Sequence, residues 1–114
     1  MVMNDARLDL VFAALSHATR RGLLARLAAG EQNITTLAAD YNVSQPAISK
    51  HIGVLERAGL ISSERRGREH VLRIVPGPAQ DAQGWIAYYT QFWLQHFNAV
   101  DELIARRKEQ PREP

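Results

Sequence analysis

Apolar side chains recur at intervals of three and four residues along most of this chain, a spacing that is typical of amphipathic helices. The first such run consists of Leu8, Val11, Phe12 and Leu15. Three further helices are expected where the same pattern is bounded by residues that favour helix ends. These helices are predicted over about 17–29, 34–41 and 45–58, with Ser16, Asn33 and Ser44 as N-caps and with Gly30 and Gly59 ending the first and the last.

The segment between the third and fourth of these helices has the composition of a tight turn. Asn42 tolerates the left-handed backbone conformation that such a turn needs. Pro46 is tolerated only in the first turn of a helix, so it places the next helix directly after Ser44. With the small residue Ala38 where the two helices could cross, this arrangement predicts a helix-turn-helix.

The apolar period changes from helical to alternating over residues 60–75, which predicts a β-hairpin. Gly67 would supply the positive φ angle of its turn. Arg66 and Arg68 flank that glycine, so the tip of the hairpin is expected to carry two guanidinium groups. The segment 76–78, Pro-Gly-Pro, is expected to close the hairpin because it cannot continue a strand.

A long last helix is expected over about 80–108, and it carries a wide aromatic stripe. Two Trp, two Tyr and two Phe lie between Trp85 and Phe97. One domain can cover one face of such a helix, but this stripe is too wide for a single neighbour. Packing against a second copy around a twofold axis would bury the rest. The expected interface between subunits consists of Leu8, Val11, Phe12, Trp85, Tyr89, Phe92, Trp93, His96 and Val100.

The composition is that of one small folded domain. A length of 114 residues allows a modest core, and a hydrophobic content of 46% excludes a disordered chain. We expect a single domain over residues 1–108 and a polar, frayed tail over 109–114. The net charge of +2 does not by itself indicate that the protein binds nucleic acid, but the placement of the charged residues along the chain does. Residues 16–29 contain three arginines without an acid, and residues 62–75 contain four arginines against two glutamates.

Several classes of function are disfavoured by what the chain lacks. It has no cysteine, which excludes disulfides, thiolate metal sites and thiol switches. We expect no enzymatic activity, because the chain has no glycine-rich phosphate loop, nucleophile elbow or paired His–Glu helix motif. Neither a metal nor another cofactor is expected, since the histidines are scattered over four predicted elements; they are His17, His51, His70 and His96.

The hydrophobic pattern also argues against a membrane location. No apolar run approaches the roughly 20 residues that cross a bilayer. Asp5, Arg7 and Asp9 interrupt the first segment where a signal peptide would need apolar residues. We therefore expect a cytoplasmic protein without a membrane partner.

Three segments of the chain resemble those of one known family. Residues 12–21, FAALSHATRR, look like the start of its second helix. Residues 44–61, SQPAISKHIGVLERAGLI, resemble its recognition helix and the beginning of its wing, and residues 66–68, Arg-Gly-Arg, resemble its wing tip. Together with the order of the elements, the resemblance covers residues 8–105 and points to the arsenical-resistance-repressor (ArsR/SmtB) family. It implies an α+β, mainly α, winged helix-turn-helix: four helices, a β-hairpin and a fifth helix.

The resemblance also implies a function and partners. Members of this family act as homodimers in which the first and fifth helices form the interface, and each subunit places a recognition helix in the major groove. They repress transcription, usually of the operon that holds their own gene, until an inducer releases them. For this chain the resemblance implies a sequence-specific repressor of an inverted-repeat operator in double-stranded DNA, which an unidentified small-molecule effector could release.

The residues expected to contact DNA lie on the fourth helix and at the tip of the hairpin. Gln45, Ser49 and Lys50 can reach base edges in the major groove. Ser44, at the helix N-terminus, favours a phosphate, and His51 could contact a phosphate or bond the adjacent scaffold. Arginines at the tip suit the minor groove or its phosphates. The full expected set is Ser44, Gln45, Ala47, Ser49, Lys50, His51, Arg66, Gly67 and Arg68.

The chain departs from the family in lacking its metal-binding motifs. The predicted helix over 34–41 has no cysteine, and in the last helix Asp101 and Glu102 are off the spacing that would pair them with His96. The alternative function is a winged helix used only for contact with another protein. The sequence does not distinguish an activator from a repressor. It also leaves open whether the aromatic stripe belongs to a core within one subunit or lines a pocket for a ligand.

Overall fold

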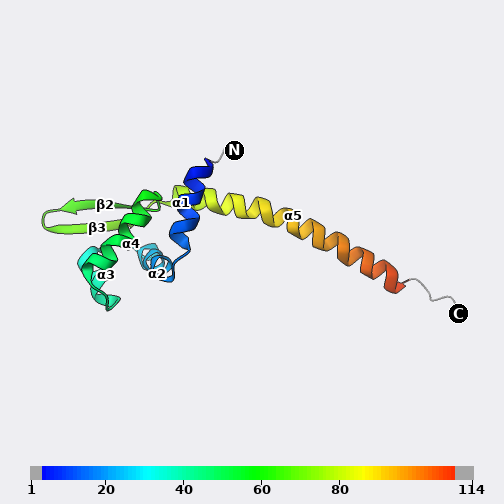
Figure 1. Ribbon diagram of the computed structural model, residues 1–114, viewed down its shortest axis with the longest axis horizontal. Helices are drawn as coiled ribbons and strands as arrows, with labels where there is room; N and C mark the ends of the chain where they lie inside the picture. Colours follow the sequence, from blue (N-terminus) through cyan, green and yellow to red (C-terminus); the bar gives the residue numbers. More distant parts are fainter. Residues whose placement is uncertain (1–3, 110–114) are drawn as a thin grey trace. The chain divides into compact units, whose positions relative to one another are not determined.

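In the computed structural model, which describes residues 4–109, the chain forms five helices and three strands (Figure 1). They are, in chain order, α1 (Asp5–Leu15), α2 (Ala18–Ala28), β1 (Gln32–Asn33), α3 (Ile34–Asp40), α4 (Gln45–Arg57), β2 (Ile61–Arg66), β3 (Glu69–Ile74) and α5 (Pro76–Glu109). This mainly helical α+β order is that of a winged helix-turn-helix, as predicted.

The chain divides into two compact units, residues 1–82 and residues 83–114. The first unit holds the elements from α1 to β3 and the beginning of α5. The second unit holds the rest of α5, which ends at Glu109. The single domain predicted over residues 1–108 stays a prediction, and residues 110–114 of the predicted tail lie outside the described residues.

The two helices of the helix-turn-helix begin at the predicted caps. Asn33 Oδ1 accepts a hydrogen bond from the backbone amide of Thr35 at 2.8 Å, and Ser44 Oγ accepts one from that of Ala47 at 3.3 Å. Between them, Asn42 has a φ of 50°, in the left-handed region. Local sequence signals therefore place both α3 and α4 correctly.

The start of α2 differs from the prediction. Ser16 ends α1, and its hydroxyl donates to the carbonyl of Ala13 at 2.6 Å. The N-cap of α2 is instead His17, whose Nδ1 accepts from the amide of Thr19 at 3.1 Å. A histidine nitrogen replaces the hydroxyl here because Ser16 is already engaged with the preceding helix.

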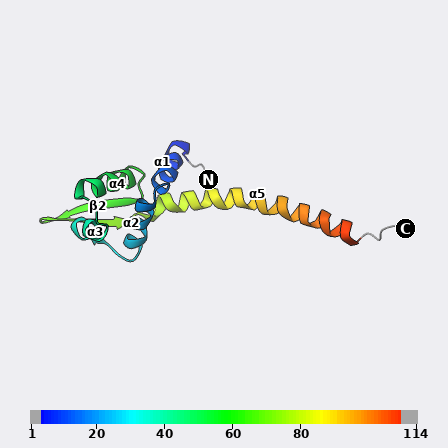
Figure 2. The same ribbon diagram turned by 60° about the horizontal axis from the view of Figure 1, so that its bottom comes forward.

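The predicted hairpin is formed by β2 and β3, and Gly67 at its turn has a φ of 62°. The structure adds β1, which pairs antiparallel with β3, so that the order in the sheet is β1-β3-β2. Gln32 of β1 lies opposite Leu72. The sequence pattern did not reveal β1, because two residues are too short to show a period. The tip of the hairpin extends beyond α3 and α4 in both views (Figures 1 and 2).

Apolar side chains of all four short helices and of the sheet meet in one core within the first unit. Ile48 and Leu55 of α4 and Leu72 of β3 are completely buried there. The core consists of Leu8, Val11, Ala14, Leu23, Leu27, Leu37, Ala38, Ile48, Ile52, Leu55, Ala58, Leu60, Ile61, Leu72 and Ala82. Because this core covers the apolar side of α4, it determines which side of that helix is exposed.

Two residues assigned to the subunit interface belong to this core instead. Leu8 and Val11 are only 8% and 1% exposed, because neighbouring helices of the same subunit cover them. Phe12 is half-buried against the same core. On α1 the exposed large apolar residue is Leu10, on another face of the helix. The amphipathic pattern correctly showed which face of α1 is covered. It did not show whether the same subunit or a second one covers that face.

The last helix begins earlier than predicted. Pro76 and Pro78 form its first turn, where a missing amide hydrogen is tolerated, instead of closing the hairpin as a separate segment. Ala82 still belongs to the core of the first unit. Beyond it, the aromatic side chains from Trp85 to Phe97 are exposed. Within residues 4–109, no helix is long and apolar enough to cross a membrane.

Replacing Leu72 with alanine should destabilise the first unit strongly. The side chain is fully buried between the sheet and the helices, so its loss leaves a cavity that costs roughly 2–5 kcal/mol. Val43→Ala, at an exposed position in the turn before α4, should change the unfolding free energy by less than about 0.5 kcal/mol. Urea unfolding at one fixed protein concentration measures both, and equal effects of the two substitutions would contradict the assigned core.

Candidate nucleic-acid interface

One side of α4 is exposed and polar. Ser44, Gln45, Ser49 and Lys50 are exposed, and Ala47 lies half-buried between them. The opposite side of the helix is buried in the core, so these side chains cannot turn inward. The structure therefore brings this part of the predicted DNA-binding set together on one surface. Contact of these side chains with DNA stays a prediction.

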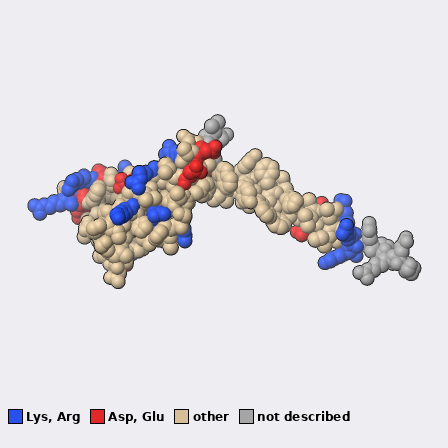
Figure 3. All heavy atoms as spheres, in the orientation of Figure 1, with Lys and Arg blue, Asp and Glu red and all other residues tan. Residues whose placement is uncertain are grey.

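The hairpin β2–β3, here called the wing, carries the second part of the predicted set. Arginine side chains gather at its tip, where Figure 3 shows them in blue. Its strand β2 packs against α4, so the two predicted groups lie on neighbouring elements. Within residues 4–109, Arg65 and Arg68 form no ion pair with an acid. Their charges are therefore available to an external anion.

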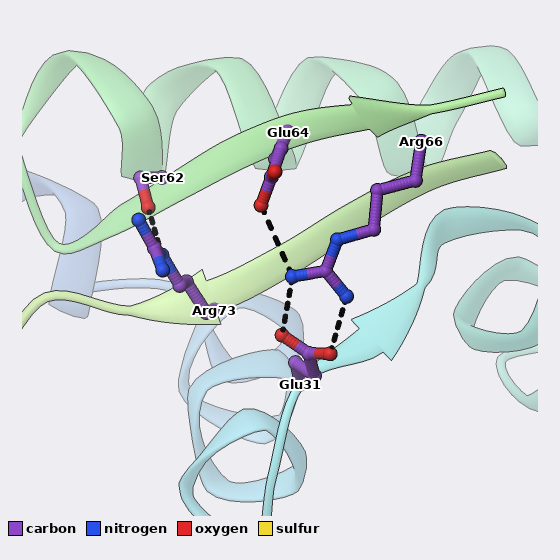
Figure 4. Close-up of polar contacts among 5 residues, drawn as sticks. All are labelled: Glu31, Ser62, Glu64, Arg66 and Arg73. Carbon is purple, nitrogen blue, oxygen red and sulfur yellow. Dashed lines mark hydrogen bonds and ion pairs between the residues drawn. The ribbon is translucent and has the colours of Figure 1, made fainter.

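Arg66 differs from its neighbours, because two carboxylates hold it (Figure 4). Its guanidinium crosses β3 and donates to Glu31 at 2.6 and 3.3 Å, and it donates to Glu64 at 3.1 Å. This contact lowers the pKa of Glu31 through its hydrogen bond and charge, and the two carboxylates raise the pKa of Arg66. Arg66 was predicted as a free tip arginine; in this structure it ties the wing to the segment before β1.

The sequence prediction omitted Arg65, which the structure exposes. The strand register places Arg65 opposite His70, on the same face of the sheet as the buried residue Ile61. That is the face that β2 turns toward the core and α4. The sequence contained a signal for Arg65, because side chains alternate between the two faces of a strand. Arg65 is four positions after Ile61, so it lies on the same face as Ile61, and it is two positions before the turn residue Gly67.

The arginines of the segment 16–29 are engaged inside the first unit. Arg26 forms an ion pair with Asp40. Arg21 donates to the carbonyl of Leu15 at 2.7 Å. Arg20 donates to carbonyls of α1 and also contacts α4. The positive charge of this segment, noted in the sequence, thus joins α2 to its neighbours.

His51 makes the scaffold contact that the sequence left as one of two options. Its Nδ1 lies 3.1 Å from Nη1 of Arg20 on α2. Its ring also lies 4.5 Å from the ring of His17, measured between centroids. Burial lowers the pKa of His51, and the neighbouring His17 and Arg20 lower it further. These surroundings therefore favour the neutral form of the imidazole.

Metal ligands do not gather in the described part of the chain. Among residues 4–109, no three His, Cys, Asp or Glu side chains lie close enough together to hold a metal ion.

The predicted interface residues of α5 line one exposed surface of the second unit. Trp85 stacks on Tyr89 with ring centroids 5.5 Å apart, and Trp93 lies 5.0 Å from Phe97. An open apolar hollow is lined by Tyr89, Phe92, Trp93 and His96. Val100 continues the same exposed side. Rings of one helix contact one another here without being buried.

Titration of Glu31 provides a test of the contact that ties the wing to β1. We expect a titration midpoint below the ordinary value of 4.5, because the carboxylate accepts hydrogen bonds from Arg66. A lowered pKa in the folded state means that the pair stabilises the protein above pH 4.5 and that this stability is lost as the pH falls through the folded-state pKa. Side chains 46% exposed make the effect small and sensitive to salt.

The measurement is an NMR titration of the side-chain carboxyl carbon of Glu31. Arg66→Gln should move the midpoint up toward the ordinary value, whereas Glu64→Gln, which leaves the Arg66–Glu31 pair in place, should leave it low. An unshifted midpoint in the wild-type protein would contradict the contact.

Comparisons with known proteins agree with this geometry. A family model described as a helix-turn-helix domain matches residues 15–64. The transcriptional repressor SdpR of Bacillus subtilis is 34% identical over 76 residues, which are 67% of this chain and 84% of that protein. The HTH-type transcriptional regulator Rv2034 of Mycobacterium tuberculosis is 33% identical over 99 residues, which are 84% of this chain and 87% of that protein.

A solved structure that matches most of the chain gives the same family assignment. The crystal structure of the ArsR family transcriptional regulator RHA00566 superposes with a TM-score of 0.76 and 31% sequence identity. The match covers 82% of this chain and 96% of that chain. Sequence, element order and fold agree, and the protein belongs to the ArsR family of winged helix-turn-helix transcriptional regulators.

Proposed function

We propose that this protein is a transcriptional repressor that binds, as a homodimer, an inverted repeat in the promoter of its own operon. The observation that carries the proposal is the exposed polar side of α4, which lies next to a wing with unpaired Arg65 and Arg68. Membership of a family of transcription regulators supports DNA as the partner, and no enzymatic role belongs to that class. The relative SdpR is itself named a transcriptional repressor.

The proposed contacts divide into base readout and phosphate binding. Gln45, Ser49 and Lys50 would read base edges, since amide, hydroxyl and ammonium groups match the donors and acceptors of the major groove. Arg65 and Arg68 would bind phosphates or the minor groove from the wing. Contacts to phosphate supply affinity without sequence information, whereas base contacts supply specificity. With Arg66 held by Glu31 and Glu64, the free protein offers two unpaired arginines at the wing.

The proposed dimer rests on the exposed side of α5. Its large apolar side chains are 39–62% exposed in the single chain, from Trp85 to Ile104. Residues 82–100 contain no Asp, Glu, Lys or Arg, so covering this stretch would remove none of these charged side chains from water. A second copy presents an identical surface and can cover it around a twofold axis. Such a dimer would place its two α4 helices at half-sites about one helical turn, roughly 34 Å, apart.

Two further possibilities are weighed against this proposal. A winged helix that only contacts another protein would need neither the polar side of α4 nor unpaired arginines at the wing. A small-molecule effector could enter the hollow of Tyr89, Phe92, Trp93 and His96, but the same hollow is part of the surface that a second subunit would cover. The dimer therefore takes precedence, and release by an effector acting through this interface follows from it.

DNA binding should distinguish base contacts from phosphate contacts. The probe is a fluorescent duplex from the promoter of the protein's own gene, compared with a scrambled duplex of equal length and composition. Gln45→Ala should weaken binding to the promoter roughly 5- to 150-fold and leave the scrambled duplex unaffected, as expected when a base contact is lost. Arg68→Ala should weaken binding to both duplexes and reduce the slope of log K against log salt by about one.

Matched controls lie outside the proposed interface. Gln80→Ala and Arg107→Ala remove the same side-chain types from exposed positions of α5 and should bind like the wild-type protein. If the wild-type protein binds both duplexes equally, or if the Gln45 and Arg68 variants behave like the controls, specific repression through this surface is wrong and the protein-contact alternative gains support.

The oligomeric state provides the test of the dimer. Sedimentation equilibrium at micromolar concentration should give twice the chain mass of 12.8 kDa. Phe92→Glu should shift the mass to that of one chain, because it places a charge in the proposed interface. The adjacent substitution Gln91→Glu adds the same charge on the polar side of α5 and should leave the dimer intact. A wild-type protein that stays a single chain, even after the promoter duplex is added, would overturn the dimer.

A further inference from the structure

One arginine joins three helices of the first unit. Arg20 of α2 donates from Nε to the carbonyl of Ala14 at 2.7 Å and from Nη2 to the carbonyl of Ala13 at 3.1 Å. These carbonyls belong to the last turn of α1, where the carbonyl of Ala13 also accepts from the backbone amide and the hydroxyl of Ser16. The remaining nitrogen, Nη1, lies 3.1 Å from Nδ1 of His51 on α4. Arg20 therefore bonds the end of α1 and the candidate recognition helix with one planar group.

This contact determines where the proton of His51 lies. A guanidinium group has only donors and stays charged, so Nδ1 of His51 must be the acceptor. A neutral imidazole with an accepting Nδ1 carries its hydrogen on Nε2. Burial, followed by the neighbouring His17 and Arg20, lowers the pKa of His51 and so favours the neutral ring. Protonation of Nδ1 would remove the acceptor and set two cations against each other.

We propose that Arg20 is a positioning residue for DNA binding, which holds α4 in its binding orientation by bonding Nδ1 of His51 while it bonds the end of α1. The inference rests on the proposed function, since its effect is read on DNA. The proposal adds Arg20, which is not among the residues expected to contact DNA, to those that determine DNA binding. It also assigns Nδ1 of His51 the role of accepting the hydrogen bond from Arg20. His51 lies on α4 one turn after Ala47 and directly follows Lys50, so a rotation of the helix at His51 displaces the polar side chains that face the groove.

The neighbouring arginine provides a matched control. Arg21 also bonds the end of α1, through the carbonyl of Leu15 at 2.7 Å. The described contacts of its guanidinium do not include α4. If bonding the end of α1 were all that mattered, the two arginines would be equivalent. If the connection to α4 matters, only Arg20 is needed for specific binding.

The first experiment reads the contact in the free protein. Two-bond proton–nitrogen NMR spectra at pH 7.5 should show His51 as the tautomer with its hydrogen on Nε2 and with Nδ1 unprotonated. A ring protonated on Nδ1 would overturn the inference. This result does not depend on DNA, so the proposal can fail here while the proposed function stands.

The second experiment substitutes each nitrogen of His51 separately. His51→Asn keeps an acceptor near the position of Nδ1, and His51→Gln places its amide near that of Nε2 instead. We expect the asparagine variant to bind the promoter duplex within about threefold of the wild-type protein, and the glutamine variant to bind it about tenfold or more weakly, as for the loss of a bond to a charged group. Equal affinities of the two variants, at any level, would overturn the proposal.

The third experiment compares the two arginines. Arg20→Lys, which cannot bond both helices with one planar group, should reduce the preference for the promoter over the scrambled duplex about tenfold or more. Affinity for the scrambled duplex should stay unchanged, since no phosphate contact is removed. Arg21→Lys should keep the wild-type preference. A uniform loss on both duplexes, or the same loss in both variants, would contradict a positioning role. A wild-type protein without any preference would count against the proposed function instead.

Discussion

Burial of one side of α4 is the constraint on which the candidate site depends. Ile48, Ile52 and Leu55 are all nearly or completely removed from solvent, and each of these side chains contributes about 1.5–3 kcal/mol when it is fully buried. A rotation of α4 that turned Gln45 or Lys50 inward would expose these side chains and bury polar groups without partners. The hydrophobic core therefore determines the orientation of the helix, and the candidate DNA-binding surface is the side that the core leaves outside.

Charge is distributed over the first unit in a way that composition does not show. Four of its arginines act as connections: Arg20 and Arg21 bond the end of α1, Arg26 pairs with Asp40, and Arg66 crosses β3 to reach Glu31. At the proposed interface, Arg65 and Arg68 of the wing and Lys50 of α4 form no ion pair with an acid within residues 4–109. A net charge of +2 is thus compatible with a local concentration of positive charge at the wing, because the placement of the charged residues differs from what their total suggests.

The second unit has the opposite character. Its helix contributes apolar area without a core of its own, and aromatic rings such as Trp85 and Tyr89 contact one another along its surface. An isolated helix is marginally stable in water and gains most of its stability from tertiary packing. Packing between copies would supply to α5 what the first unit obtains within a single chain. Folding of this helix and assembly of the regulator would then be the same event.

Sequence alone determined the features that depend on near neighbours in the chain. Helix periods, the caps Asn33 and Ser44, the left-handed Asn42 and the turn at Gly67 all follow from interactions among residues a few positions apart. The same patterns predicted the order of the elements, and the resemblance to a known family added the class of function, which the comparisons confirmed.

Tertiary structure decided what joins distant parts of the chain. Arg20 meets His51 across 31 positions and Arg66 meets Glu31 across 35, and neither pairing has a local signal. The strand β1 exists because β3 lies beside it, and Leu8 and Val11 are core residues because α2 and α4 cover them. A sequence pattern shows that a side chain will be buried or paired, but its partner is determined only when the folded backbone brings the two together in space.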